Sequence, residues 1–171
     1  NLIKEASHIF GSSTIVVAIE AIRQSDGNFY AFTDNGRERT ELEVVNWAKT
    51  VENLGAGEII LTSVDKEGTG KRFDLELISK VTKAVSIPLV AHGGAGSLEH
   101  IKEAIGEGQA SAISIASMLH YYFMANLKVD TSLEEGSSTF IKSGESFTNV
   151  NKLSIKEIKA YLKENNIPCR I

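Results

Sequence analysis

The sequence has little cysteine and proline, no excess of basic residues and no long apolar run. Its one cysteine, Cys169, excludes an intrachain disulfide and favours a reducing compartment, so we expect a cytoplasmic protein. The formal net charge of -4 argues against nucleic acid as a partner, because surfaces that bind nucleic acid are usually basic. No segment provides the roughly 18 to 20 consecutive apolar residues that span a bilayer, so we expect no membrane partner.

The rest of the composition is that of an ordinary folded domain. The chain has 171 residues, of which 42% are hydrophobic and 23% are charged. A chain of this length buries most of the surface that it exposes when unfolded, so we expect residues 1–171 to form a single domain. Because the sequence begins with Asn1 rather than methionine, we also expect it to be a fragment of a longer polypeptide.

Apolar runs alternate with amphipathic segments along most of the chain. Helical periodicity over residues 1–10 ends at Gly11, and a run of β-branched residues follows. The pattern then predicts strands at 14–19, 58–64, 87–91 and 111–116, and helices at 40–54, 74–85 and 97–107. We therefore expect four parallel βα units preceded by one helix.

Local signals refine this prediction. Thr40 and Glu43 have the spacing of a capping box, which predicts that a helix begins there. Ser154 and Glu157 form a second capping box before a final helix. Residues 29–33 lie between turn-forming dipeptides and are expected to be the second arm of a small hairpin. Residues 121–152 are rich in Gly, Ser, Thr, Asn and Glu, so we expect an inserted, flexible loop there.

Four βα units amount to half of a barrel. The α/β fold called the (β/α)₈ or TIM barrel needs eight strands and typically about 250 residues. A half-barrel leaves two bare strand edges, which are prone to pair with another chain. We therefore expect a C-terminal half-barrel that either self-associates or lacks its N-terminal half-barrel.

Two glycine-containing loops follow two of the predicted strands. Gly68 and Thr69 come after the strand at 58–64, and Gly93, Gly94 and Ala95 come after the strand at 87–91. Parallel α/β proteins bind ligands beyond the carboxyl ends of their strands. Glycine also lets a phosphate group approach backbone N–H groups closely. The two loops therefore predict a site for a phosphorylated small molecule.

Several segments resemble one known family in their order and spacing. Residues 16–21, 55–65, 67–69 and 93–96 closely resemble the cyclase subunit of imidazole glycerol phosphate synthase, an enzyme of histidine biosynthesis. The resemblance covers nearly the whole chain except residues 121–152 and corresponds to the second half of that family's barrel. It implies a lyase that takes ammonia from a glutaminase subunit and closes an imidazole ring on phosphoribulosyl formimino aminoimidazole carboxamide ribotide.

The resemblance also assigns roles to individual residues. Glu20 matches the family's second acid–base aspartate, and a glutamate can also shuttle the protons that ring closure requires. The family's second phosphate site matches Gly93, Gly94, Ala95, Ala116 and Ser117, and we expect Gly68 and Thr69 to reach the same phosphate through an N–H group and a hydroxyl. The first catalytic aspartate and the other phosphate site belong to the missing half, so we expect this fragment alone to be inactive.

Further candidates lie near the same strand ends. The other active-site candidates are Thr62, Asp65, Glu67 and His92, although the two carboxylates are equally compatible with a solvated turn. Glu58, at the start of its strand, matches a carboxylate of the family's ammonia gate. The histidines and the single cysteine do not have the spacing of metal ligands, so we expect no metal and no cofactor.

Two other functions stay open at this point. One is a related synthase that uses partner-supplied ammonia to amidinate a nucleotide sugar for a surface glycan, which the glutamate at position 20 and the insertion at 121–152 favour. The other is a non-catalytic half-barrel that binds phosphate and self-associates, which requires no chemistry from the missing strands. Formation of imidazole glycerol phosphate from ammonium by the full-length protein separates the cyclase from both alternatives.

Overall fold

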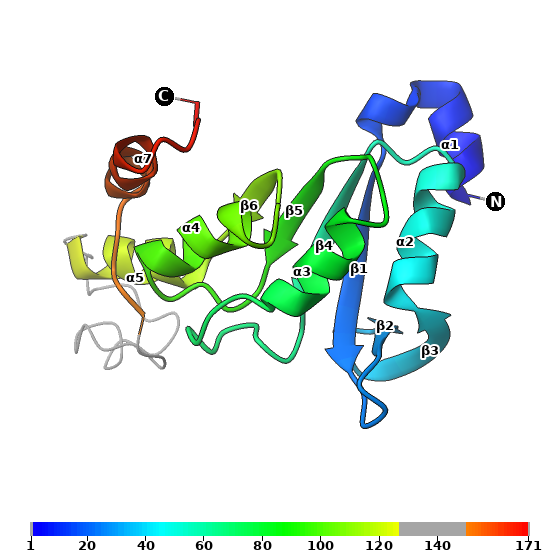
Figure 1. Ribbon diagram of the computed structural model, residues 1–171, viewed down its shortest axis with the longest axis horizontal. Coiled ribbons are helices and arrows are strands. Elements are labelled where there is room, and N and C mark those ends of the chain that lie inside the picture. The colour runs from blue at the N-terminus through cyan, green and yellow to red at the C-terminus, as the bar shows by residue number, and fades with distance from the viewer. Residues whose placement is uncertain (1, 127–149, 171) are drawn as a thin grey trace, which may run out of the picture.

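The computed structural model describes residues 2–126 and 150–170 (Figure 1). The helices are α1 (Leu2–Phe10), α2 (Val44–Asn53), α3 (Leu75–Thr82), α4 (Leu98–Gly106), α5 (Ser117–Asn126) and α7 (Ile155–Glu164). A short 3₁₀ helix, η1 (Ser12–Thr14), follows α1. The strands are β1 (Val16–Arg23), β2 (Phe29–Thr33), β3 (Glu38–Glu43), β4 (Glu58–Ser63), β5 (Leu89–His92) and β6 (Ala112–Ser114).

The strands form one six-stranded sheet in the order β3-β2-β1-β4-β5-β6. Strands β1, β4, β5 and β6 are parallel to one another, and a helix follows each of them along the chain, after the β2–β3 hairpin in the case of β1. Together with α1, these elements are the four parallel βα units that the sequence predicts. The predicted fold class, an α/β half of a TIM barrel, is confirmed.

The hairpin after β1 is larger than predicted and corrects one helix start. Strand β2 pairs antiparallel with the carboxyl half of β1 and with β3, so one expected bare edge is partly covered. The predicted capping box at Thr40 is wrong, because Thr40 lies in β3 and its hydroxyl donates to the Ala31 carbonyl at 2.6 Å. Helix α2 instead begins at Val44, because the Glu43 carboxylate accepts N–H groups of its first turn.

The other local predictions agree better with the structure. Helices α3, α4 and α7 begin where capping side chains accept backbone N–H groups, namely those of Asp74, Ser97 and Ser154. Strand β1 spans Val16–Arg23 rather than 14–19, because η1 occupies the preceding residues and the hairpin extends the ladder.

The expectation of a flexible loop at 121–152 is wrong at its start. Residues 121–126 belong to α5, and beyond the gap Val150 is buried while the N–H of Asn151 donates to the Gly96 carbonyl at 2.8 Å. The rest of that expectation, from 127 to 149, lies outside the described residues.

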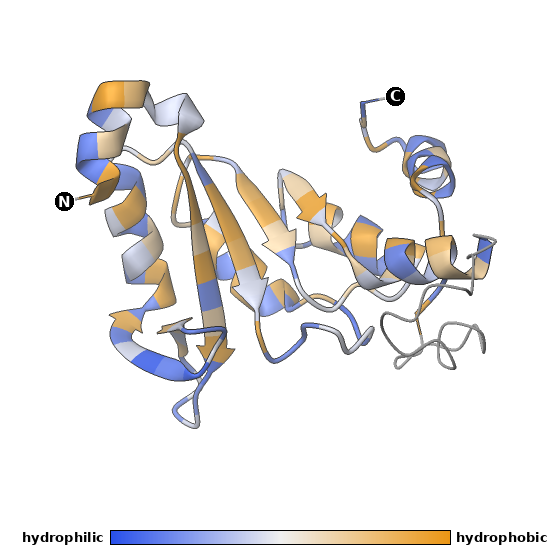
Figure 2. Cartoon of the chain, turned by 180° about the vertical axis from the view of Figure 1, so that it is seen from behind, coloured by the Kyte–Doolittle hydropathy of each residue, from blue (hydrophilic) through white to orange (hydrophobic). Residues whose placement is uncertain are grey.

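The two faces of the sheet have different surroundings. On β4, Ile59, Leu61 and Ser63 are buried on the face that the helices cover, whereas Ile60 and Thr62 are half-buried on the other face. Seen from behind in Figure 2, the parallel strands lie in front of helix α3, α2 lies beside β1, and none of the described helices crosses in front of the strands. We call this second face the open face. In a closed barrel it faces the interior.

Candidate functional site

A row of polar side chains crosses the open face near the carboxyl ends of the parallel strands. The register pairs Glu20 with Thr62, Thr62 with His92, and His92 with Ser114. Residues in register on parallel strands project from the same face, and neighbouring strands lie about 4.8 Å apart. These four side chains form what we call the polar row. The next row toward the amino ends is apolar and consists of Ala18, Ile60, Val90 and Ala112.

The sequence places Glu20 at the end of the first strand. In the structure it lies within β1 instead, because the strand continues to Arg23. Its Oε2 accepts the N–H of Gly36 at 2.9 Å, in the turn between β2 and β3. Gly36 has a φ of 76°, and a Cβ there would lie 2.8 Å from Cγ1 of Val64. The hairpin therefore holds one oxygen of this carboxylate at the open face. The catalytic role of Glu20 stays a prediction.

A cavity of about 150 Å³ opens beside the polar row, between the loops that follow β4, β5 and β6. We call it the glycine cavity. It is lined by Glu67, Gly68, His92, Gly93, Gly94, Ala95, Ser114, Ile115, Ala116 and Ser117. This lining contains every predicted phosphate-binding residue except Thr69. Sites for whole drug-sized ligands measure about 300–1,000 Å³, so the glycine cavity fits one end of a ligand.

Backbone N–H groups without an acceptor line the glycine cavity. Within the described residues, no hydrogen bond is made by the N–H groups of Gly68, Gly93, Gly94, Ala95 and Ala116. Ser117 is the first residue of α5, so its N–H has no acceptor within the helix either. Polar groups in proteins are normally paired, and backbone N–H groups without an acceptor, in glycine loops and at helix N-termini, commonly bind anions. The phosphate role predicted for these residues stays a prediction that this geometry favours.

The loop after β5, which we call the glycine loop, requires its glycines because of close backbone contacts. Gly93 and Gly94 have φ angles of 94° and 103°, in the left-handed region that other residues rarely adopt. A Cβ at Gly93 would lie 2.6 Å from the carbonyl oxygen of Ser63, and one at Gly94 would lie 2.2 Å from that of Arg72. The Arg72 N–H also donates to the Gly94 carbonyl at 2.8 Å. The loop after β4 therefore fixes the path of the loop after β5.

Two of the predicted residues do not reach the glycine cavity. The hydroxyl of Thr69 donates to the Lys66 carbonyl at 2.7 Å, and the N–H of Thr69 donates to the same carbonyl at 3.1 Å. Oδ2 of Asp65 accepts the backbone N–H of Arg23 at 2.9 Å, on the side of the hairpin. Both residues therefore stabilise loops, and Glu67, on the cavity wall, is exposed.

The remaining candidates lie on the open face. Thr62 and His92 contact each other through Oγ1 and Nδ1, which are 3.2 Å apart. Glu58, the residue predicted for an ammonia gate, is paired in register with Val16 at the amino end of the sheet. It projects from the same face as Thr62 because four residues separate them on one strand. The gate role of Glu58 stays a prediction.

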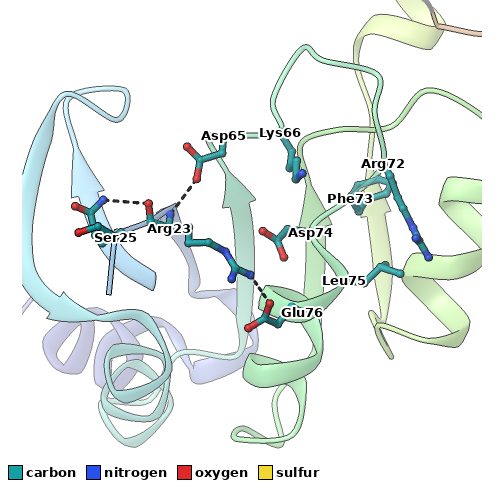
Figure 3. Close-up of a pocket in the computed structure, with 10 residues that line it drawn as sticks. Arg23, Ser25, Asp65, Lys66, Arg72, Phe73, Asp74, Leu75 and Glu76 are labelled. Carbon is teal, nitrogen blue, oxygen red and sulfur yellow. Dashed lines mark hydrogen bonds and ion pairs between the residues drawn. The ribbon is translucent and has the colours of Figure 1, made fainter. Parts of the chain in front are cut away.

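A larger cavity of about 640 Å³ lies beside the hairpin, and Figure 3 shows its lining. We call it the charged cavity. Arg23 reaches across it to Glu76, which also accepts from Lys80 at 2.8 Å. These hydrogen bonds, first from Arg23 and then from Lys80, lower the pKa of Glu76 to about 2. Most charges of this cavity therefore already have protein partners.

Sequence reasoning missed two residues of the site. Ser114 belongs to the polar row, and strand alternation would have placed it beside His92 had the pairing of the strands been known. Gly36, which holds Glu20, carried only the signal of an Asn-Gly turn, because its contact with β1 depends on how the hairpin folds over the sheet. Local patterns do not encode such contacts.

His100 has a structural role, and the described residues contain neither a cluster of metal-ligating side chains nor a membrane-spanning helix. Nδ1 of His100 accepts the N–H of Gly96 at 3.2 Å, so this histidine supports the end of the glycine loop. Among residues 2–126 and 150–170, no group of three or more His, Cys, Asp or Glu side chains could hold a metal ion. No helix in the same ranges has the length and apolar character needed to span a membrane.

Comparison with known proteins gives one family. Residues 1–124 match the family described as "Histidine biosynthesis protein", and this range includes every predicted site residue. Over 170 residues the chain is 42% identical to the imidazole glycerol phosphate synthase subunit HisF of Hydrogenobaculum sp. (strain Y04AAS1), an alignment that covers 99% of the chain and 56% of the relative.

Two further relatives have the same name. The protein of Prochlorococcus marinus (strain MIT 9215) is 41% identical over 172 residues, which cover 99% of the chain and 56% of the relative. The protein of Alkaliphilus metalliredigens (strain QYMF) is 42% identical over 135 residues, which cover 79% of the chain and 54% of the relative. The chain therefore spans about half the length of the curated relatives it matches.

Proposed function

We propose that this chain, which belongs to the histidine biosynthesis protein family, forms the C-terminal half of a cyclase of the imidazole glycerol phosphate synthase type. The reaction uses ammonia to close the imidazole ring on phosphoribulosyl formimino aminoimidazole carboxamide ribotide. The single cysteine of the chain, Cys169, supports a reducing, cytoplasmic setting for it.

One observation carries this proposal. A carboxylate suited to acid–base chemistry lies at the same end of one parallel sheet as a cavity whose lining residues have N–H groups without a partner among the described residues. TIM-barrel enzymes place their catalytic groups at the carboxyl ends of the strands, and many bind phosphate with the loops after the last two strands. Here those loops follow β5 and β6, and they contain Gly93, Gly94, Ala95 and Ser117.

In the proposed chemistry, the glycine cavity binds the substrate and Glu20 transfers protons. The glycine cavity binds one phosphate group of the substrate through backbone N–H groups and the Ser117 hydroxyl. This contact fixes the substrate across the polar row, where Glu20 transfers protons between the ammonia-derived nitrogen and the substrate oxygen. The contact between Gly36 and Oε2 leaves Oε1 of Glu20 as the oxygen that exchanges the proton.

The ammonia comes from a partner in this proposal. The matched relatives are named as subunits, which supports an assembly, and we propose a glutaminase subunit as the partner. Glu58 lies at the opposite end of the sheet from the glycine cavity, where ammonia would enter a closed barrel. We propose that Glu58 is one carboxylate of the gate at that entrance.

The open face and α1 support pairing with a second half-barrel. Val16 on the open face is 47% exposed, and Ala18 beside it is also exposed. On α1, Leu2, Ile9 and Phe10 are 80%, 70% and 68% exposed, which is unusual for large apolar side chains. We propose that an N-terminal half-barrel, or a second copy of this chain, covers these surfaces. This fragment without such a cover is expected to be inactive.

The experiment that tests the function uses protein expressed from the complete gene, with ammonium and the ribotide substrate. We expect imidazole glycerol phosphate to form, and Glu20→Gln to slow its formation about 10²- to 10⁴-fold, the usual share of a general acid–base group. Binding of ribulose 5-phosphate by the same variant should stay within about threefold of the original protein, because Glu20 lies outside the glycine cavity.

The alternatives correspond to other outcomes. A protein that binds ribulose 5-phosphate but forms no imidazole glycerol phosphate with ammonium contradicts the cyclase. Turnover of a nucleotide sugar would then favour the amidinating synthase, and a stable dimer with no turnover of either substrate would favour the non-catalytic, phosphate-binding half-barrel.

A further inference from the structure

His92 occupies a special place in the site, because it belongs to both the polar row and the glycine cavity. It is the last residue of β5, in register with Thr62 on one side and with Ser114 on the other. It is half-buried, and it lines the cavity together with Gly93 and Gly94. A side chain at this point can touch a ligand that the glycine loop holds.

The contact with Thr62 leaves one ring nitrogen of His92 for a ligand. Nδ1 lies 3.2 Å from Oγ1 of Thr62, and Nε2 makes no hydrogen bond within the described residues. A neutral imidazole has one nitrogen that donates and one that accepts, so the partner of Nδ1 decides what Nε2 can do.

The surroundings of Thr62 favour one direction for this hydrogen bond. The Thr62 hydroxyl has no other hydrogen-bond partner among the described residues. If Nδ1 donated its hydrogen to Oγ1, the hydroxyl hydrogen would be left without an acceptor from this part of the chain. If the hydroxyl donates to Nδ1 instead, the bond uses both the hydroxyl hydrogen and the Nδ1 lone pair, and the ring hydrogen lies on Nε2, where a ligand can accept it.

We infer that His92 is a ligand-binding residue that donates its Nε2 hydrogen to a phosphate oxygen in the glycine cavity, with Thr62 as the positioning residue that fixes this tautomer. This inference rests on the proposed function, since it requires phosphate in that cavity. His92 would add a side-chain donor to the backbone N–H donors of the glycine cavity. Thr62 contacts no ligand and acts only through the imidazole ring.

The glycine cavity contains a carboxylate, and the inference accounts for it. Glu67 lies on the wall, but its side chain is exposed and makes no hydrogen bond within the described residues, so it can extend into water. The remaining wall consists of glycine and alanine backbone, Ser114, Ser117, Ile115 and the imidazole. This is a donor-rich wall, which favours a phosphate monoester over a cation.

The test compares two variants of His92 by their binding of ribulose 5-phosphate and inorganic phosphate, measured calorimetrically on protein from the complete gene. His92→Asn places its amide donor near the Nδ1 position, whereas His92→Gln places one near Nε2. We expect His92→Asn to weaken binding about 10- to 100-fold, as loss of a hydrogen bond to a charged group does, and His92→Gln to restore most of it. Equal, undiminished binding by His92→Asn overturns the inference.

A second measurement observes the tautomer of His92 directly and tests the role of Thr62. Long-range ¹H–¹⁵N spectra, assigned with the help of His92→Asn, show directly which ring nitrogen carries the hydrogen. We expect hydrogen on Nε2 in the original protein and a mixture of tautomers in Thr62→Val, with phosphate affinity reduced about 3- to 10-fold. Hydrogen on Nδ1 of the phosphate-bound original protein overturns the inference.

These results separate the inference from the function on which it rests. An original protein that binds neither phosphate nor ribulose 5-phosphate overturns the proposed phosphate site and the inference with it. An original protein that binds both, with His92→Asn equally competent, overturns the inference and leaves the proposed function intact.

Discussion

The glycine cavity and the charged cavity lie close together but differ in whether their polar groups have partners within the protein. The charged cavity is the larger, at about 640 Å³ against about 150 Å³. In it, Glu76 accepts from two cations, Asp74 caps α3, and Asp65 accepts the Arg23 N–H. The glycine cavity instead presents backbone donors that have no acceptor within the described residues.

Whether polar groups already have partners identifies a ligand site better than the volume of a cavity does. A ligand that enters the charged cavity must break existing ion pairs, and the free energy gained is reduced by that cost. A phosphate group that enters the glycine cavity supplies acceptors that the donors lack, so no protein contact is lost. The smaller cavity is therefore the better candidate for the ligand site.

The largest effect is expected from Gly94→Ala, which breaks the glycine cavity itself. Its φ is 103°, and the added Cβ would lie 2.2 Å from the Arg72 carbonyl oxygen, so the loops after β4 and β5 must separate. We expect the free energy of unfolding to fall by about 2–4 kcal/mol and ribulose 5-phosphate affinity to fall at least about 30-fold. Urea unfolding and calorimetry measure the two effects.

Gly27→Ala is the matched control for this change. Gly27 has a φ of 82°, but a Cβ there has nothing within 4 Å, and Gly27 lines neither cavity. Backbone strain alone should then cost about 1 kcal/mol of stability and leave phosphate affinity unchanged. If both variants bound phosphate equally well, the glycine cavity would not be the binding site.

The sequence predicts the glycine cavity well because its features are local. Glycines that follow an apolar run specify a tight turn after a buried strand, and capping residues such as Asp74 and Ser97 specify where the next helix begins. These signals span a few residues each. Their repetition along the chain is what reveals the parallel units and thus the common edge at which the loops gather.

The parts that the sequence did not reveal depend on long-range contacts. Thr40 has the spacing of a capping residue, but pairing with Ala31 across the hairpin outweighs that local preference. The anchoring of Glu20 by Gly36, and the diversion of Asp65 toward Arg23, likewise join segments that only the folded hairpin brings together. The order of residues in the loop after β4 does not show that Asp65 lines the charged cavity whereas Gly68 lines the glycine cavity.

An intermediate effect is expected from a pair of variants that assign phosphate to one cavity. Ser117→Ala removes a hydroxyl from the wall of the glycine cavity and should weaken ribulose 5-phosphate binding about 3- to 10-fold with little loss of stability. Arg23→Gln breaks the pair with Glu76 in the charged cavity and should lower stability without changing that affinity. The reverse result, with affinity lost only in Arg23→Gln, would move phosphate to the larger cavity.

The smallest effect concerns the pairing that closes the charged cavity to ligands. The pKa of Glu76 is lowered from 4.5 to about 2, chiefly by the hydrogen bond from Arg23. Because the folded-state pKa is the lower one, Glu76 contributes stability that is fully present above about pH 4.5 and is lost as the pH falls toward 2. The side chain is 48% exposed, so water and salt reduce this contribution.

Glu76→Gln should therefore lower the urea midpoint slightly at neutral pH, and the difference from the original protein should shrink as the pH approaches 2. High salt should reduce the difference at neutral pH as well, because it screens the two cations from the carboxylate. A difference that stays constant from neutral to acidic pH would mean that Arg23 and Lys80 do not hold this carboxylate. Their donors would then be available to a ligand, and pairing would no longer distinguish the charged cavity from the glycine cavity.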